Sequence, residues 1–125
     1  MFAYIMIGTN DRERALEFYD GLMAEMGIER FMDFRHISFY GKDINHVFLG
    51  VCTPVDRKDA TVGNGSMIAL AGGSKENVDR IYNKGIELGA TCEGKPGVRP
   101  AGLYCAYFRD LDGNKFNVCC PGEEQ

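Results

Sequence analysis

Helical spacing of apolar residues predicts a helix after the first apolar segment of the chain. Residues 2–8 form an apolar run of strand length, and between Asp11 and Met26 apolar residues recur every three or four positions. Thr9-Asn10-Asp11 offers N-cap side chains, and Gly27 suits the position just after a helix. We therefore expect a strand followed by a helix over about 11–26.

The second half of the chain repeats this order. An apolar strand over 67–70 precedes Ser74, a predicted N-cap, and Gly89 follows the last residue of the helical pattern. A shift of 63 residues places Tyr4 on Met67. An internal repeat of this kind predicts two copies of one supersecondary unit.

Three short strands are expected after each helix. They cover 29–33, 36–40 and 46–51 in the first half, and 91–93, 104–109 and 115–120 in the second, with a Gly/Pro loop over 94–102 and an Asp112-Gly113-Asn114 hairpin turn. We predict an α+β fold in which two βαβββ repeats form a curved mixed sheet around a cavity, with the helices outside. We expect one domain over 1–125, with repeat 1 at about 1–52, a linker at 53–64 and repeat 2 at about 65–121.

Composition narrows the classes of partner. The 125 residues carry a net charge of −4 and 45% hydrophobic residues, which is ordinary for a globular domain. Nucleic-acid binding would require a basic stripe, and a membrane helix would require about 18 consecutive apolar residues. We expect neither partner.

The cysteines indicate a reducing compartment. The count of five is odd, no C-x-x-C motif occurs, and the apolar N-terminus lacks the features of a secretory signal. Cys119 and Cys120 are adjacent in a predicted strand, so their side chains point to opposite faces and cannot clamp one metal ion. We predict buried, reduced thiols and a cytoplasmic protein.

Two stretches carry a family resemblance: Ile7-Gly8-Thr9-Asn10-Asp11 with the helix that follows, and the segment from Tyr104 to Lys115, in which Leu111 stands where proline is commoner. With the internal repeat, the chain resembles the vicinal oxygen chelate superfamily, which includes glyoxalase I, bleomycin-resistance proteins and extradiol dioxygenases. The resemblance implies the fold predicted above, a small-molecule ligand and a homodimer. It does not define the chemistry, because this fold supports many reactions.

The resemblance also implies where a metal would bind. Members that use a metal place His or Glu at four strand positions, which correspond here to Tyr4, Met67, Asn117 and either Phe48 or Leu49. None of these is a histidine or a carboxylate, and thioether and amide groups are poor ligands for a hard divalent ion. We therefore expect no metal and no other cofactor.

Strand alternation places several side chains in the predicted cavity. His46 begins a strand and is a candidate acid or base at the rim, or a solvated strand-end histidine; Arg99 is a candidate contact for an anionic ligand, or a solvated loop arginine. Tyr104 offers a phenol, or packs within the sheet. No catalytic residue is assigned. The predicted ligand-cavity set is Tyr4, His46, Phe48, Met67, Arg99, Tyr104 and Asn117.

The prediction for function is metal-free binding of a small molecule in this cavity. The alternative is a metal-dependent lyase, isomerase or dioxygenase of the glyoxalase type, with a displaced metal site that includes His46. A third possibility is a filled cavity and a domain that mediates only protein contacts.

Overall fold

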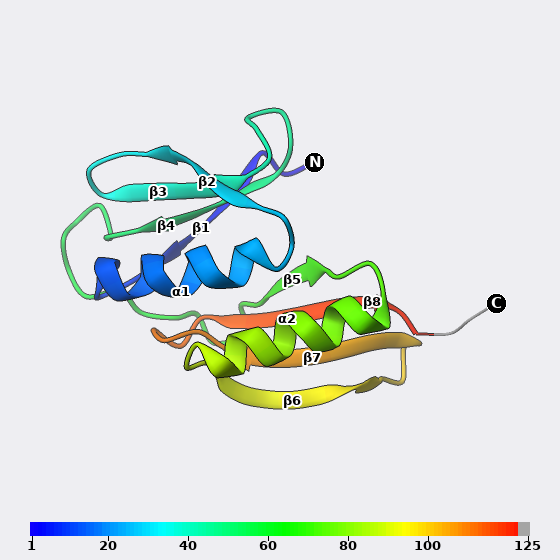
Figure 1. Cartoon of the computed structure of the whole chain (residues 1–125). Helices are drawn as coiled ribbons and strands as arrows, with labels where there is room; N and C mark the ends of the chain where they lie inside the picture. The colour runs from blue at the N-terminus through cyan, green and yellow to red at the C-terminus, as the bar shows by residue number, and fades with distance from the viewer. Residues whose placement is uncertain (123–125) are drawn as a thin grey trace. The chain divides into compact units, whose positions relative to one another are not determined.

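The computed structural model describes residues 1–122 and divides into two compact units, Met1–Val62 and Gly63–Gln125 (Figure 1). The boundary falls inside the predicted linker. Each unit has the order strand, helix and three strands, so the predicted α+β class and the two βαβββ repeats are confirmed.

The first unit is a four-stranded mixed sheet with one helix. Its strand order is β1-β4-β3-β2, with β1 parallel to β4 and the other pairs antiparallel. The elements are β1 (Tyr4–Gly8), α1 (Arg12–Ala24), β2 (Glu29–Asp33), β3 (Ile37–Gly41) and β4 (Phe48–Cys52).

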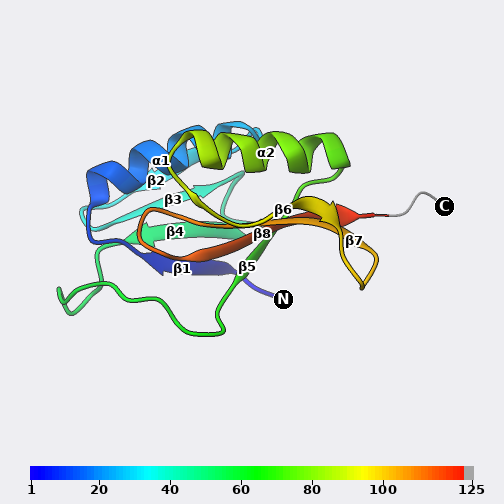
Figure 2. The same cartoon turned by 90° about the horizontal axis from the view of Figure 1, so that it is seen from below.

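The second unit has the same topology, with the order β5-β8-β7-β6 and β5 parallel to β8. The strands therefore pair within each unit and form two sheets. In both units the helix runs along one face of its own sheet (Figure 2). The elements are β5 (Ile68–Ala71), α2 (Lys75–Glu87), β6 (Thr91–Val98), β7 (Leu103–Arg109) and β8 (Lys115–Pro121).

Both predicted helices begin and end where the capping residues indicate. Asp11 accepts a hydrogen bond from the Arg14 amide at 3.1 Å, and Ser74 accepts one from Asn77 at the same distance. The glycine after each helix, Gly27 or Gly89, adopts a positive φ that side-chain-bearing residues rarely adopt. These caps confirm the predicted helix boundaries to within two residues.

The core of each unit lies between its helix and its sheet. Burial of these aliphatic and aromatic side chains is the main favourable contribution to folding. In the first unit the buried set includes Phe18, Leu22, Tyr40 and Val51; in the second it includes Val78, Ile81, Phe108, Phe116 and Val118. No helix among residues 1–122 is long and apolar enough to cross a membrane.

One predicted loop is a strand in the structure. We expected a Gly/Pro loop over 94–102, but β6 continues through Pro96 and Gly97 to Val98. Because β6 is the edge of its sheet, it tolerates a proline and two register shifts that a central strand would not. The prediction was wrong in the first half of this segment.

The closing hairpin has the predicted turn. The buried carboxylate of Asp110 accepts hydrogen bonds from the amides of Asp112 (2.9 Å) and Asn114 (2.8 Å), and Gly113 has φ +94°. This turn sets the register of β7 against β8.

Candidate functional site

The face of the first sheet opposite α1 carries a cluster of aromatic side chains, called the aromatic face below. Tyr4 of β1 and Phe48 of β4 are register partners, and their rings stack with centroids 5.1 Å apart and planes 10° apart. Phe39 of β3 meets both edge-on, 5.8 Å from Tyr4 and 5.3 Å from Phe48. Phe31 and Phe34 extend the cluster with further edge-on contacts. The Tyr4 side chain remains half exposed, which leaves an apolar surface with a phenol beside it.

Two glycines allow the rings to approach the backbone. A Cβ at Gly50 would lie 2.6 Å from the Met6 sulfur and 2.7 Å from the Phe39 ring. A Cβ at Gly41 would lie 2.6 Å from Cβ of Phe48. Both distances are well inside van der Waals contact, so the aromatic face requires glycine at these positions.

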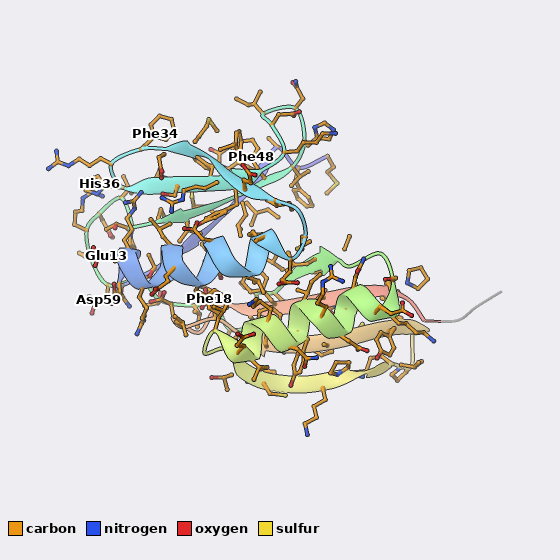
Figure 3. The ribbon with its side chains drawn as sticks, viewed as in Figure 1. Glu13, Phe18, Phe34, His36, Phe48 and Asp59 are labelled. Atoms are coloured by element: carbon orange, nitrogen blue, oxygen red, sulfur yellow. The ribbon has the colours of Figure 1, made fainter. Side chains whose placement is uncertain are left out.

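A cavity of about 490 Å³ adjoins the aromatic face at the carboxyl end of β4. Its volume lies in the range of small-molecule sites. Figure 3 shows Phe34 and His36 at the turn between β2 and β3, where this cavity lies. The lining residues are Met6, Phe34, Arg35, His36, Ile37, Cys52, Thr53, Val55 and Arg57.

The basic side chains of the cavity come from two loops. Arg35 and His36 belong to the β2–β3 turn, and Arg57 belongs to the segment after β4. Partial burial lowers the pKa of His36, and the positive charges of Arg57, Arg35 and Arg12 lower it further. The cavity thus combines an apolar floor with two arginine side chains and a histidine.

A thiol lies in the same cavity. Cys52 is half-buried at the end of β4, and burial raises the pKa of its thiol. This side chain is therefore a chemical reporter of cavity access.

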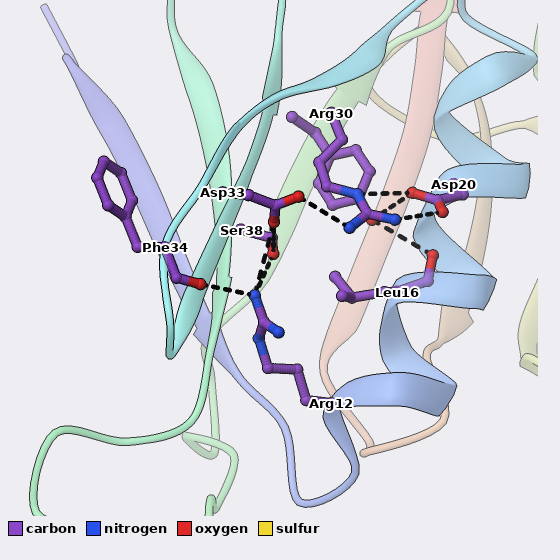
Figure 4. Close-up of polar contacts among 8 residues, drawn as sticks. Arg12, Leu16, Asp20, Arg30, Asp33, Phe34 and Ser38 are labelled. Carbon is purple, nitrogen blue, oxygen red and sulfur yellow. Dashed lines mark hydrogen bonds and ion pairs between the residues drawn. The ribbon is translucent and has the colours of Figure 1, made fainter.

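A polar cluster on the α1 side of the sheet holds the β2–β3 turn (Figure 4). The Arg12 guanidinium donates to the Phe34 carbonyl at 3.0 Å and to the Ser38 hydroxyl, and lies 3.6 Å from Asp33. The Ser38 hydroxyl donates to Asp33; this hydrogen bond, followed by the charges of Arg30 and Arg12, lowers the pKa of Asp33. Arg12 thereby fixes, from the far side of the sheet, the turn that lines the cavity.

The same cluster ties β2 and β3 to the helix. Arg30 bridges Asp20 of α1 at 2.7 Å and Asp33 at 3.0 Å, and the Tyr40 hydroxyl donates to Asp20 at 2.8 Å. Burial, followed by the hydrogen bond to Asp20, raises the pKa of Tyr40. Charge-assisted bonds of this kind position the sheet relative to α1.

The second sheet carries a different set on the face opposite α2. Asn117 and Tyr107 are register partners there, and Asn117 is 6% exposed. The Asn117 carbonyl oxygen is buried and finds no hydrogen-bond partner among residues 1–122. Arg99 and Lys115 both lie over the Tyr107 ring, at 5.4 and 5.7 Å from its centroid. This face is therefore polar where the aromatic face of the first unit is apolar.

Comparison with known proteins identifies the family. The family model of the glyoxalase/bleomycin resistance protein/dioxygenase superfamily matches residues 1–118. The chain belongs to this superfamily. A search of curated proteins finds no match to its sequence.

Solved structures of the superfamily agree with the fold. The chain is similar to a glyoxalase/bleomycin resistance protein from Albidiferax ferrireducens T118, at 39% identity and a TM-score of 0.87, over 95% of this chain and 97% of that one. The fosfomycin resistance protein FosX from Listeria monocytogenes has 16% identity and a TM-score of 0.70, over 100% and 94%. Lactoylglutathione lyase from Agrobacterium tumefaciens has 20% identity and a TM-score of 0.68, over 95% and 92%. At these lower identities the likeness concerns the fold alone.

The predicted site residues of this superfamily member fall into both units. In the first unit, Tyr4 and Phe48 belong to the aromatic face, and the register selects Phe48 over Leu49 as the partner of Tyr4. His46 is exposed and precedes β4, whereas the cavity adjoins the other end of that strand; its Nδ1 lies 2.7 Å from the Asp43 carboxylate.

The remaining predicted residues belong to the second unit. Met67 precedes β5 and is exposed, and Asn117 lies on the face opposite α2. Arg99 donates to two backbone carbonyls of β6, both at 2.8 Å. Tyr104 lies on the other face, because its hydroxyl donates to Asp79 of α2 at 2.7 Å. We therefore leave Tyr104 out of the proposed site.

The residues at the superfamily's metal-ligand positions do not fit a divalent ion. Tyr4 packs against the Phe48 ring, and Met67 and Asn117 offer a thioether and an amide. Within residues 1–122, no group of three or more His, Cys, Asp or Glu side chains is placed to hold a metal ion.

Sequence reasoning missed the basic side chains of the cavity. Arg35 and His36 are not in the predicted ligand-cavity set, and Arg57 lies in the segment predicted as a linker. The available signal was topological. Because β3 and β4 are antiparallel, the turn before Ile37 and the segment after Cys52 meet at the same end of the sheet.

Proposed function

We propose that this superfamily member binds a small organic molecule on the aromatic face and in the adjoining cavity, without a divalent metal ion. The observation that carries the proposal is the Tyr4–Phe48 stack, 5.1 Å between centroids. It occupies positions at which metal-using relatives are expected to carry ligands and presents an aromatic surface instead. Such a surface binds apolar groups by burial and ring contacts.

Asn117 supports a second candidate contact in the other unit. A buried carbonyl oxygen without a hydrogen-bond partner costs about 1–3 kcal/mol, and a ligand N–H or O–H would offset that cost. Met67 and Arg99 remain candidate contacts for the same unit.

The test combines metal analysis with a ligand screen. Protein purified without chelator is expected to contain far less than one equivalent of zinc, nickel, iron or manganese. A thermal-shift screen of small acids, aldehydes and antibiotics is expected to find stabilising compounds. Tyr4→Ala should weaken the binding of these compounds. Tyr104→Phe changes the α2-facing side of the other sheet and should leave their binding unchanged.

Two outcomes would contradict the proposal. Near-stoichiometric metal that is lost in His46→Ala would overturn metal-free binding and favour the alternative with a displaced metal site. A screen without a single stabilising compound would favour a domain that mediates only protein contacts.

Two further predictions concern assembly and compartment. We propose a homodimer, from the family resemblance, and a reducing cytoplasm, from the odd cysteine count. Light scattering coupled to gel filtration tests the first prediction. Titration of this protein's own thiols in freshly lysed cells tests the second.

A further inference from the structure

The cavity beside the aromatic face is lined by side chains of one charge sign. Arg35, His36 and Arg57 contribute its basic groups and Cys52 its thiol, and among residues 1–122 no Asp or Glu belongs to the lining. The loop carboxylate of Asp56 does not line the cavity and accepts a hydrogen bond from the Lys58 amide at 3.0 Å. An uncompensated positive rim above an apolar floor favours an anion that carries an apolar body.

The loop that carries Arg57 is ordered by its own side chain. The Arg57 guanidinium donates to the carbonyls of Pro54 (2.9 Å) and Val55 (3.2 Å), and its backbone amide donates to Pro54 at 2.9 Å. Among residues 1–122, Arg57 is the only non-glycine residue with a positive φ, +64°. A guanidinium held in this way loses little further freedom when it binds an anion.

The β2–β3 turn, which forms the opposite wall of the cavity, is also held by hydrogen bonds. Arg12 donates to the Phe34 carbonyl from the α1 side, and the Phe34 amide donates to Ile37 at 2.7 Å. The Thr53 amide donates to the His36 carbonyl at 2.9 Å and so connects the turn to the segment after β4. The two walls that carry the basic side chains are thus joined by backbone hydrogen bonds.

We propose that this cavity selects an amphipathic organic carboxylate, with its head group between Arg35 and Arg57 and its apolar body over Met6. His36 stands beside the head group as a further hydrogen-bonding group. The inference rests on the proposed function and adds the chemical class of its ligand. A carboxylate matches the geometry of a guanidinium fork, and the apolar floor excludes small hydrophilic anions as good ligands.

A matched pair of probes tests this selection. Binding of 4-phenylbutyrate and of the neutral 4-phenylbutyramide to the full chain is measured by titration calorimetry at low salt and pH 7.5. The carboxylate is expected to bind about tenfold more tightly than the amide, as for a charge-assisted hydrogen bond at a partly exposed site. Arg57→Gln and Arg35→Gln should each reduce that ratio to about threefold or less. Lys42→Gln removes the same charge outside the cavity and should leave the ratio unchanged.

Protection of Cys52 localises the binding. Carboxylate bound in the cavity should slow alkylation of Cys52 at pH 8.5 several-fold, and the exposed Cys92 of β6 serves as the internal control. Peptide mass spectrometry measures both thiols.

The outcomes separate the two proposals. Equal affinity for acid and amide, with Cys52 protected by both, would refute the carboxylate selection and leave the proposed function intact. A ratio that persists in both arginine variants would also refute it, because the head group would then bind elsewhere. Failure of both probes to bind or to protect Cys52 would count against both proposals.

Discussion

Gly50→Ala is expected to destabilise the first unit because the aromatic face has no room for a methyl group at this position. The new Cβ would lie 2.6 Å from the Met6 sulfur and 2.7 Å from the Phe39 ring, where contact requires about 3.5–4 Å. Met6 is flexible, but Phe39 is 8% exposed and packs against Tyr4 and Phe48. Overpacking costs about 1–3 kcal/mol, and the entropy gained by replacing glycine returns about 0.4–1 kcal/mol. The expected net loss is about 1–2 kcal/mol.

Urea unfolding followed by far-UV circular dichroism measures this loss, and near-UV circular dichroism reports the ring environment. Adding Met6→Ala removes one of the two close contacts, so the double variant should be less destabilised than the sum of the single variants by about 0.5–1 kcal/mol. A Gly50→Ala protein within 0.5 kcal/mol of the natural chain, with an unchanged near-UV spectrum, would refute the close packing of the aromatic face.

Three further predictions concern single polar side chains. Asp11→Ala and Ser74→Ala each remove an N-cap hydrogen bond of 3.1 Å and should each cost about 1 kcal/mol in equilibrium unfolding. Asp110→Ala leaves two backbone amides of the closing turn without their acceptor and should cost about 1–3 kcal/mol in the same assay. The folded-state pKa of Asp33 is lowered, mainly by Ser38, so its contribution is present above the unfolded carboxyl pKa of about 3.9 and is lost as the pH falls through the folded value. Urea unfolding from pH 6 to pH 3 should therefore show a smaller acid-induced loss of stability in Asp33→Asn.

The secondary structure was predictable because its signals are local. Caps such as Asp11 and Ser74, and glycines such as Gly27 and Gly89, determine helix ends through bonds within a few residues. The internal repeat then predicted the topology of the second unit from that of the first. The continuation of β6 through Pro96 was not predictable locally, because it depends on the edge position of that strand.

Residues of the candidate site were predictable from the sequence only where strand alternation determines which face of the sheet a side chain occupies. Tyr4 and Phe48 share a face by alternation and register. The same rule separates Tyr104 from Asn117: the cross-strand partner of Asn117 is Tyr107, and a residue three positions away points to the opposite face. The cavity was not predictable from local sequence patterns, because its basic side chains come from two loops that only the tertiary fold brings together.

The two repeats differ most on the faces that their helices leave uncovered. On the helix-facing side both sheets keep large buried groups, such as Val51 in one and Val118 in the other, because a packed core tolerates few changes of volume. On the opposite side the first sheet carries stacked rings around Phe48, whereas the second carries Asn117 beside Tyr107. Packing against a helix constrains the volume and apolarity of the side chains on the helix-facing side. The side chains on the opposite side are free to vary in chemistry. Membership of the superfamily therefore predicts the fold of this chain, while the choice of ligand has to be read from the aromatic face and its cavity.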